Sequence, residues 1–207
     1  MAKAGVKTTT YSLDWDVVVN LESRLVRDFK LSMTKNLGVD LLIVSIGSRL
    51  GLRVVDSLQL KWGDLMGLEV GDAFVRSEKK TGKDRVLAMS SKLKEVLELV
   101  YKSLVPDLDE FILTSQKGKG RSAMSIQNFN RRLKKIMASY KVRYLGNCSS
   151  HLLRKSWVVG AIRKGFEAGD HLSLVKVSKL VGHTNVSTTL RYTNFEMTQA
   201  FSLYELT

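Results

Sequence analysis

Three polar segments in the last quarter of the chain dominate its pattern: HLLR at residues 151–154, LVGH at residues 180–183 and TLRYTN at residues 189–194. They contain two of the chain's three histidines, and Tyr192 follows the histidine of LVGH by nine positions. An apolar helical pattern ends at the glycine of LVGH, where glycine is a common helix stop. A short helix from about residue 186 would bring Tyr192 back towards His183. The three segments therefore predict a helical domain that gathers these polar side chains at one place.

The individual motifs also have ordinary structural readings. If Ser149 or Ser150 caps a helix, His151 and Arg154 lie in its first turns on one face, where an arginine fork and an imidazole could hold two phosphate oxygens. An isolated HxxR is more often an exposed basic helix start. His183 alone would more often be a surface or capping residue, and Tyr192 alone a packing aromatic. Tyrosine is nevertheless a reasonable nucleophile for phosphoryl transfer, because its ester conserves the bond energy for religation.

Two upstream segments add cationic candidates. Arg53 follows Gly51, where one apolar helix ends and another begins, and an inward arginine there needs an anionic partner. Lys80 lies in the basic turn KKTGK at residues 79–83, which is either a solvated hairpin tip or a tip that enters a DNA groove and protonates a departing 5′-oxygen. Two arginines, a lysine, two histidines and a tyrosine together could attack a phosphodiester without a metal.

The charge of the chain points to a polyanionic partner. Its 207 residues include 33 Lys+Arg and 20 Asp+Glu, which gives a net charge of +13 and a pI near 9.9. Neutralising phosphates releases counterions, so nucleic acid is the first candidate and an anionic membrane surface the second. The longest apolar run, around residues 39–46, is broken by Asp40 and Ser45 and is far shorter than the roughly 18 residues that a membrane span needs. A single cysteine, Cys148, fits a reducing compartment, so we expect a cytoplasmic protein.

The periodicity predicts a mainly helical α+β fold with a small three-stranded antiparallel sheet. Val17, Val18, Leu21 and Leu25 would share one face of the first helix, after a cap at Ser12 or Asp14. Further helices are expected at 41–50, 53–58, 91–104, 125–140, 150–164, 172–181, 186–193 and 195–206. The strands are expected at 67–70, 73–76 and 85–89. One domain over residues 12–194 would follow a basic linker at residues 1–11 and precede a helical tail at residues 195–207.

Basic residues outside the polar set are candidates for contacts with the DNA backbone. They lie in the hairpin turn, in a glycine-containing loop and on one helix face: Lys79, Lys83, Lys117, Lys119, Arg121, Arg131, Arg132 and Lys135. A plain solvated loop at residues 117–121 is about equally compatible with the pattern. The sequence has no HExxH, no CxxC pair, no acidic metal cluster and no Walker loop, so we expect neither a metal nor a nucleotide cofactor.

As a set, these motifs resemble the catalytic domain of the tyrosine recombinases, the phage integrase family. The resemblance runs from about Ser12 to Tyr192 and includes RVVDSL at residues 53–58, LKWGDL at residues 60–65 and KTG at residues 80–82. HLLR, LVGH and Tyr192 then match the family's second box in order and spacing. Each segment is a weak signal alone, but six in the right order make a chance match improbable.

The resemblance implies a role for each matched residue. Tyr192 would attack the scissile phosphate to give a 3′-phosphotyrosine, and Arg53 and Arg154 would hold the non-bridging oxygens. Lys80 would be the general acid for the 5′-oxygen, unless the hairpin register gives that role to Lys79 or Lys83. His151 would assist proton transfer at the tyrosine, and His183 would bond the phosphate. Asp56 matches an acidic position that we expect to be structural.

The resemblance also implies a function and partners. It implies a site-specific recombinase of a mobile element or chromosome, acting on double-stranded DNA as a homotetramer and existing as a monomer when free, with accessory DNA-bending proteins as further candidates. The alternatives are a non-catalytic DNA-binding module of the same fold and a type IB topoisomerase. The family usually has a separate DNA-clamping domain before the catalytic one, so we expect this chain to be part of a longer protein. The apolar stripe in the tail would dock on its own domain or on a neighbouring subunit.

Overall fold

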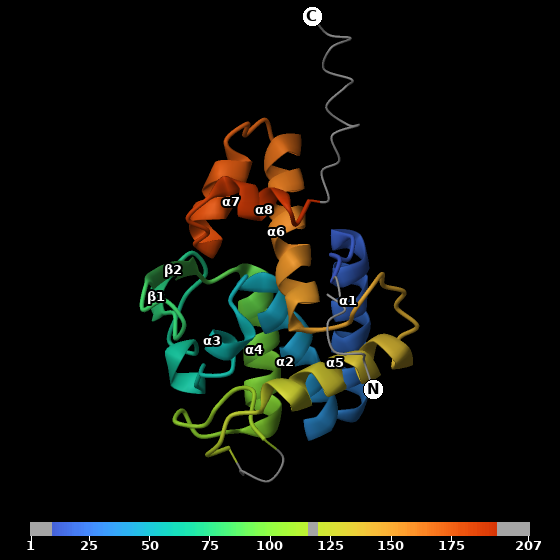
Figure 1. The fold of residues 1–207 in the computed structure, drawn as a ribbon. Coiled ribbons are helices and arrows are strands. Elements are labelled where there is room, and N and C mark those ends of the chain that lie inside the picture. The colour runs from blue at the N-terminus through green and yellow to red at the C-terminus, as the bar shows by residue number, and fades with distance from the viewer. Residues whose placement is uncertain (1–9, 116–119, 194–207) are drawn as a thin grey trace, which may run out of the picture.

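The computed structural model of the chain describes residues 10–115 and 120–193. Within that part the chain is mainly helical and has one small antiparallel sheet, as the sequence predicts (Figure 1). The helices are α1 (Trp15–Ser32), α2 (Lys35–Arg49), α3 (Val54–Ser57), α4 (Ser91–Leu104), α5 (Ile126–Ser139), α6 (Ser150–Glu167), α7 (Ser173–Val181) and α8 (Val186–Leu190), with a 3-10 turn, η1, at Trp62–Asp64. The strands are β1 (Ala73–Ser77) and β2 (Asp84–Ala88).

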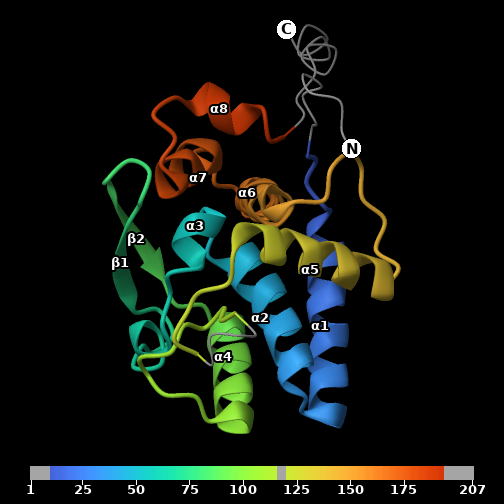
Figure 2. The same cartoon turned by 60° about the horizontal axis from the view of Figure 1, so that its bottom comes forward.

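Helix α2 is the centre of the hydrophobic core. Its apolar residues surround the helix on all sides, and Leu41, Ile43 and Ile46 are completely buried. A helix of this kind must be covered all round, and α1, α4, α5 and α6 all pack against it. Figure 2 shows α1, α2 and α4 side by side, with α5 across the ends of α1 and α2 and with α6, seen end-on, above α5. The predicted burial of this helix is confirmed.

Helix α1 covers the core with a narrower stripe than the sequence predicts. Val18, Leu21 and Leu25 are buried, but Val17 is 39% exposed. Successive residues of an α-helix are rotated by about 100°, which places Val17 at the margin of the stripe. The helix begins after Asp14, one of the two predicted caps, but the Asp14 side chain makes no capping hydrogen bond.

The prediction of a third strand at residues 67–70 is wrong. In the described residues the sheet has two strands, paired in the register Ala73↔Ala88 to Ser77↔Asp84. The segment 67–70 instead folds into turns that follow η1, where the Leu68 amide bonds the Leu65 carbonyl at 3.2 Å. The Glu69 amide donates to Asp72 Oδ2 at 2.8 Å, so these backbone groups are bonded locally rather than to a neighbouring strand.

The remaining helices agree with the predicted ones to within a few residues. Helix α4 has the predicted bounds, and the Ser90 side chain caps it by accepting from the Leu93 amide. Ser125 caps α5 in the same way through the Asn128 amide. The helix predicted at 195–206 lies outside the described residues.

Helix α6 connects two packed groups of helices. Its first half contacts the main core, while Val158 and Ile162 in its second half pack with Val177 and Val181 of α7 in a smaller cluster. Strand β2 also contacts α7, so the hairpin lies beside the end of that helix (Figure 1). The start of α6, the end of α7, α3 and the hairpin therefore meet in one region, and the predicted site residues lie on these elements and on the segment after α8.

Candidate active site

Arg154 ties the two groups of helices together from inside the protein. It lies in α6 and is only 4% exposed. Its Nη1 donates to the Gly51 carbonyl at 2.6 Å and its Nη2 to the Val181 carbonyl at 2.9 Å, linking the end of α2 to the end of α7. Burial lowers the pKa of the Arg154 guanidinium, and the Tyr192 side chain opposes that shift. The Gly51 and Val181 acceptors of Arg154 are both neutral carbonyls.

The carbonyl of Gly51 depends on a tight backbone turn. Gly51 has φ +60, and a Cβ at this position would lie 2.6 Å from the Trp157 ring. We expect Gly51→Ala to lower the free energy of unfolding by about 1–3 kcal/mol, through left-handed backbone strain and steric overlap. Urea unfolding would measure the loss, with Gly67→Ala as the control because nothing lies within 4 Å of a Cβ there. Equal stabilities of the two variants would contradict this account of the turn.

Arg53 occupies the N-cap position of α3 and forms an ion pair with Glu78. Glu78 is 2% exposed and also accepts from Arg85 Nε at 2.9 Å and from Thr81 Oγ1 at 2.6 Å. Burial acts to raise the pKa of Glu78, but the hydrogen bonds from Thr81 and Arg85 and the charges of Arg53 and Arg85 outweigh it and lower the pKa to about 2. The buried carboxylate is therefore ionised, as an inward arginine requires.

His183 and Tyr192 lie against each other. Their ring centroids are 5.2 Å apart with the planes at 87°, an edge-to-face arrangement that aromatic rings favour. His183 Nδ1 is 2.8 Å from Thr189 Oγ1, which fixes the orientation of the imidazole and leaves Nε2 for another partner. The glycine before it, Gly182, ends α7 in the left-handed conformation, as the sequence predicts.

The pKa of His183 makes the stability of the domain depend on pH. Burial, followed by the charges of Arg154, Arg53 and Arg85, lowers this pKa from 6.5 to about 4. The folded state thus favours the neutral imidazole. The stability that this neutral ring contributes is fully present above pH 6.5 and is lost as the pH falls towards 4. We expect wild type to lose about 1–2 kcal/mol more than His183→Gln between pH 7 and pH 4, after allowance for solvent screening. Urea unfolding at both pH values measures this difference, and parallel losses would contradict it.

His151 and Lys80 are the more exposed members of the predicted set. The pKa of His151 is lowered by the protein packed around the ring and by the charges of Arg154, Lys155 and Arg53, although the side chain keeps an exposed surface. Lys80 is exposed in the hairpin turn and has no polar partner among the described residues. The structure therefore brings His151 close to the arginines and leaves Lys80 free at the end of the hairpin.

Three residues of this region were missed by the sequence reasoning: Glu78, Arg85 and Lys155. Lys155 Nζ lies 5.1 Å from the centroid of the Tyr192 ring and donates to the Thr10 carbonyl at 2.6 Å. Arg85 and Leu87 alternate along β2 on the less exposed face. This alternation was the available signal for an inward arginine, and therefore for a buried acidic partner.

Asp56, expected to be structural, is 2% exposed and bonds the hairpin. Its Oδ1 accepts from the Lys79 amide at 2.9 Å. The residue thus connects α3 to the hairpin turn through the backbone and leaves the Lys79 side chain exposed.

The predicted DNA contacts fall into three groups. Most of those in the described part of the chain have exposed side chains: Lys79, Lys83, Arg121, Arg131 and Lys135. Arg132 is different, because it pairs with Asp40 and bonds the Asn36 carbonyl on α2; its guanidinium is engaged in packing α5 against α2. Lys117 and Lys119 lie outside the described residues.

The described residues contain neither a membrane-spanning helix nor a metal-binding cluster. None of the helices there is long and apolar enough to cross a bilayer. No group of three or more His, Cys, Asp or Glu side chains with the geometry of a metal site occurs among the same residues.

Known proteins resemble this chain in sequence and in fold. The model of the phage integrase family matches residues 25–199. TnP I resolvase of Bacillus thuringiensis is 29% identical over 160 residues, which cover 75% of this chain and 50% of the relative. Tyrosine recombinase XerC of Pseudomonas savastanoi pv. phaseolicola is 29% identical over 162 residues, which cover 74% and 50%. The chain thus spans about half the length of these relatives.

Two solved structures have the same fold. XerH site-specific recombinase, in a post-cleavage complex with palindromic difH substrate, has a TM-score of 0.68 at 23% identity, over 99% of this chain and 56% of that one. A lambda integrase dimer bound to a COC′ core site has a TM-score of 0.62 at 17% identity, over 93% and 50%. Both likenesses extend over nearly all of the chain.

Proposed function

The chain belongs to the phage integrase family, and from this premise we propose that it is the catalytic domain of a site-specific DNA recombinase that cuts and rejoins DNA through Tyr192. One observation carries the proposal. Tyr192 lies against His183 and packs on the cluster that contains Val181, whose carbonyl accepts from the buried Arg154, although these residues come from separate segments of the chain.

The proposed reaction is a transesterification. Tyr192 Oη forms a bond to the scissile phosphorus, the bond to the 5′-oxygen breaks, and a 3′-phosphotyrosine and a 5′-hydroxyl result. His151 assists removal of the tyrosine proton, and Lys80 donates a proton to the departing oxygen. Attack by a 5′-hydroxyl of another strand reverses these steps and releases Tyr192. Arginines supply the charge stabilisation and the ester conserves the bond energy, so the proposed cycle needs neither a metal nor ATP.

The electrostatics of the region support phosphate binding. Arg53 shares the carboxylate of Glu78 with Arg85, while the hydrogen bonds of Arg154 go to carbonyl oxygens. Positive charge is therefore in excess around Tyr192. Buried donors of this kind are already oriented when charge develops on the phosphate oxygens, which makes them effective in the transition state.

We propose double-stranded DNA as the partner and a homotetramer on DNA as the active assembly, with a monomer in its absence. The exposed basic side chains of the hairpin and of α5 support contacts with the DNA backbone. Exposed apolar side chains on and around α6, α7 and α8 support contacts between subunits; they are Phe166, Leu172, Val175, Leu180 and Leu190. Accessory DNA-bending proteins and a cytoplasmic location belong to the same proposal, as do the domain boundaries given by the sequence.

Covalent trapping tests the proposed reaction. The protein is incubated with supercoiled plasmid in EDTA, quenched with detergent and digested, and its peptides are searched by mass spectrometry for a nucleotide adduct. We expect the adduct on the peptide that contains Tyr192. An adduct on another residue would refute the assignment of the nucleophile. If this chain and its full-length protein on nicked cognate DNA both bind without forming an adduct, the domain is a binding module.

The products distinguish the recombinase from a type IB topoisomerase. A plasmid with two copies of the cognate site should yield deletion or inversion products with the full-length protein. Relaxation of the plasmid without any exchange between sites would instead favour the topoisomerase.

A further inference from the structure

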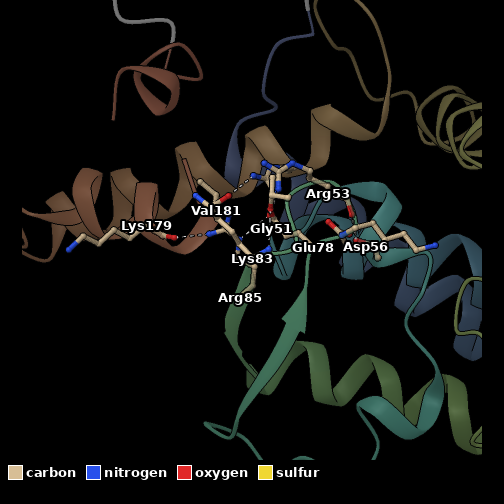
Figure 3. Close-up of polar contacts among 12 residues, drawn as sticks. Gly51, Arg53, Asp56, Glu78, Lys83, Arg85, Lys179 and Val181 are labelled. Atoms are coloured by element: carbon tan, nitrogen blue, oxygen red, sulfur yellow. Dashed lines mark hydrogen bonds and ion pairs between the residues drawn. The ribbon is translucent and has the colours of Figure 1, made fainter. Parts of the chain in front are cut away.

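We propose that Glu78 and Arg85 are positioning residues, forming a buried ion pair that holds Arg53, the hairpin turn with Lys80 and the end of α7 with His183 in one arrangement. This inference rests on the proposed function and adds to it two residues outside the six-residue set. The contacts that carry it run from α3 through the hairpin to α7 (Figure 3).

The first step concerns the carboxylate of Glu78, both of whose oxygens are used. Oε1 accepts from Arg53 Nη1 and Arg85 Nε, and Oε2 accepts from Thr81 Oγ1 at 2.6 Å. Because Glu78 engages only one terminal nitrogen of Arg53 in these contacts, the rest of that guanidinium is available to a phosphate. The same carboxylate thus orients one arginine of the proposed site and bonds the turn of the hairpin.

The second step concerns the turn itself. Thr81 directly follows Lys80, so its hydrogen bond to Glu78 holds the backbone beside the proposed general acid. Main-chain bonds from the Glu78 amide to the Lys83 carbonyl at 3.0 Å and from the Gly82 amide to the Glu78 carbonyl at 2.8 Å close the turn. With the side chain of Lys80 free in solvent, the backbone at Glu78 and Thr81 fixes the point from which it extends.

The third step is the contact of Arg85 with α7. Arg85 is 7% exposed, and its Nη1 donates to the Lys179 carbonyl at 3.0 Å, near the end of the helix. A Cβ on Gly182 would lie 0.9 Å from Arg85 Nη2, so only glycine leaves room for the guanidinium there. His183 is the next residue. The position of Arg85 therefore restrains the backbone that carries the histidine.

The variant Glu78→Gln tests the role of the ion pair, because it keeps the shape of the side chain and removes its charge. We expect Tyr192–DNA adduct formation on supercoiled plasmid to slow by roughly a hundredfold, as displaced reacting groups do, with the DNA dissociation constant changed less than threefold. Glu22→Gln is the matched control: Glu22 is equally buried and accepts from Arg49 Nε at 2.8 Å, but it joins α1 to α2 outside this region. An equal rate loss in both variants would overturn the proposal.

A second substrate separates positioning from general damage to the fold. In a duplex oligonucleotide that ends in a 3′-(4-nitrophenyl) phosphate, Tyr192 displaces nitrophenolate, which leaves without a proton from Lys80. We expect the Glu78→Gln defect to shrink by about tenfold or more on this substrate. Equal defects on the two substrates would overturn the assignment of Glu78 to the hairpin turn.

Arg85→Lys tests the link to α7 and also guards against misfolding of the first variant. Lysine retains the charge near Glu78 but cannot bond Glu78 and Lys179 with one rigid fork. We expect circular dichroism like that of wild type and a slower adduct formation on both substrates. Wild-type rates in this folded variant would overturn the proposed role of Arg85. A wild-type protein without an adduct on either substrate would instead count against the proposed function.

Discussion

We expect Tyr192→Phe to abolish covalent attachment of the protein to DNA and to leave its affinity for DNA within about threefold of wild type. Phenylalanine keeps the ring that lies 5.2 Å from His183 and that Lys155 approaches, so the packing of the segment after α8 is preserved. The hydroxyl is the only group removed. Because it is the proposed nucleophile, its loss removes the first chemical step rather than slowing it.

The measurement combines a gel-shift titration with detergent trapping on the same DNA. Tyr144→Phe serves as the control, since Tyr144 is 39% exposed and lies between α5 and α6, outside the predicted set of site residues. This variant should form the adduct at the wild-type rate. If Tyr192→Phe still attaches to DNA, another residue is the nucleophile. If it loses DNA binding as well, the hydroxyl of Tyr192 contributes to the interface.

Most helices could be predicted from the sequence because helix signals are local, although α2 begins at Lys35 and not at the predicted residue 41. Residues that cap a helix, such as Ser90 and Ser125, lie next to the apolar pattern that they begin. The prediction of a strand at residues 67–70 was wrong because a strand also needs a partner strand, which its own sequence does not reveal. Its alternation suits a strand, but the Asp72 carboxylate and η1 bond its backbone locally, and no neighbouring strand supplies a ladder in the described residues.

The residues of the site differ in how far they can be identified without knowledge of tertiary contacts. The motifs predict Arg53, Arg154, His183 and Tyr192 as a set, and the structure places these residues on elements that meet. Neither motif nor periodicity could identify Glu78 as the partner of Arg53, because the two residues are 25 positions apart and the pairing depends on how the hairpin packs on α3.

Arg132 shows the same limit of prediction from sequence, in this case for a residue that was predicted as a DNA contact. The basic stripe on its helix suggested a contact with DNA, but only the packing of α5 on α2 shows that Asp40 pairs with this arginine. A charge on a helix face thus identifies a possible partner class, whereas the adjacent element determines whether the charge is free to meet it.

The second large effect is expected for Arg154→Lys, which keeps a positive charge and loses the rigid fork. One ammonium cannot reproduce the paired contacts with the Gly51 and Val181 carbonyls and also hold phosphate oxygens. We expect adduct formation to fall by about 100- to 1000-fold, as for the loss of a preorganised donor to a transition state. The free energy of unfolding should fall by about 1–3 kcal/mol, because a buried carbonyl is left without its donor.

Arg163→Lys on the same helix is the control, since Arg163 is 47% exposed and its partners are the surface carboxylates of Asp14, Asp16 and Glu167. Adduct formation and unfolding in this variant should stay close to wild type. Inorganic phosphate then separates the two roles of Arg154. Arg154 is bonded to neutral carbonyls, so its positive charge can bind an added phosphate. Phosphate should therefore raise the melting temperature of wild type. Arg154→Lys should show a smaller rise, whereas an equal rise in both proteins would mean that Arg154 joins the helices without binding phosphate.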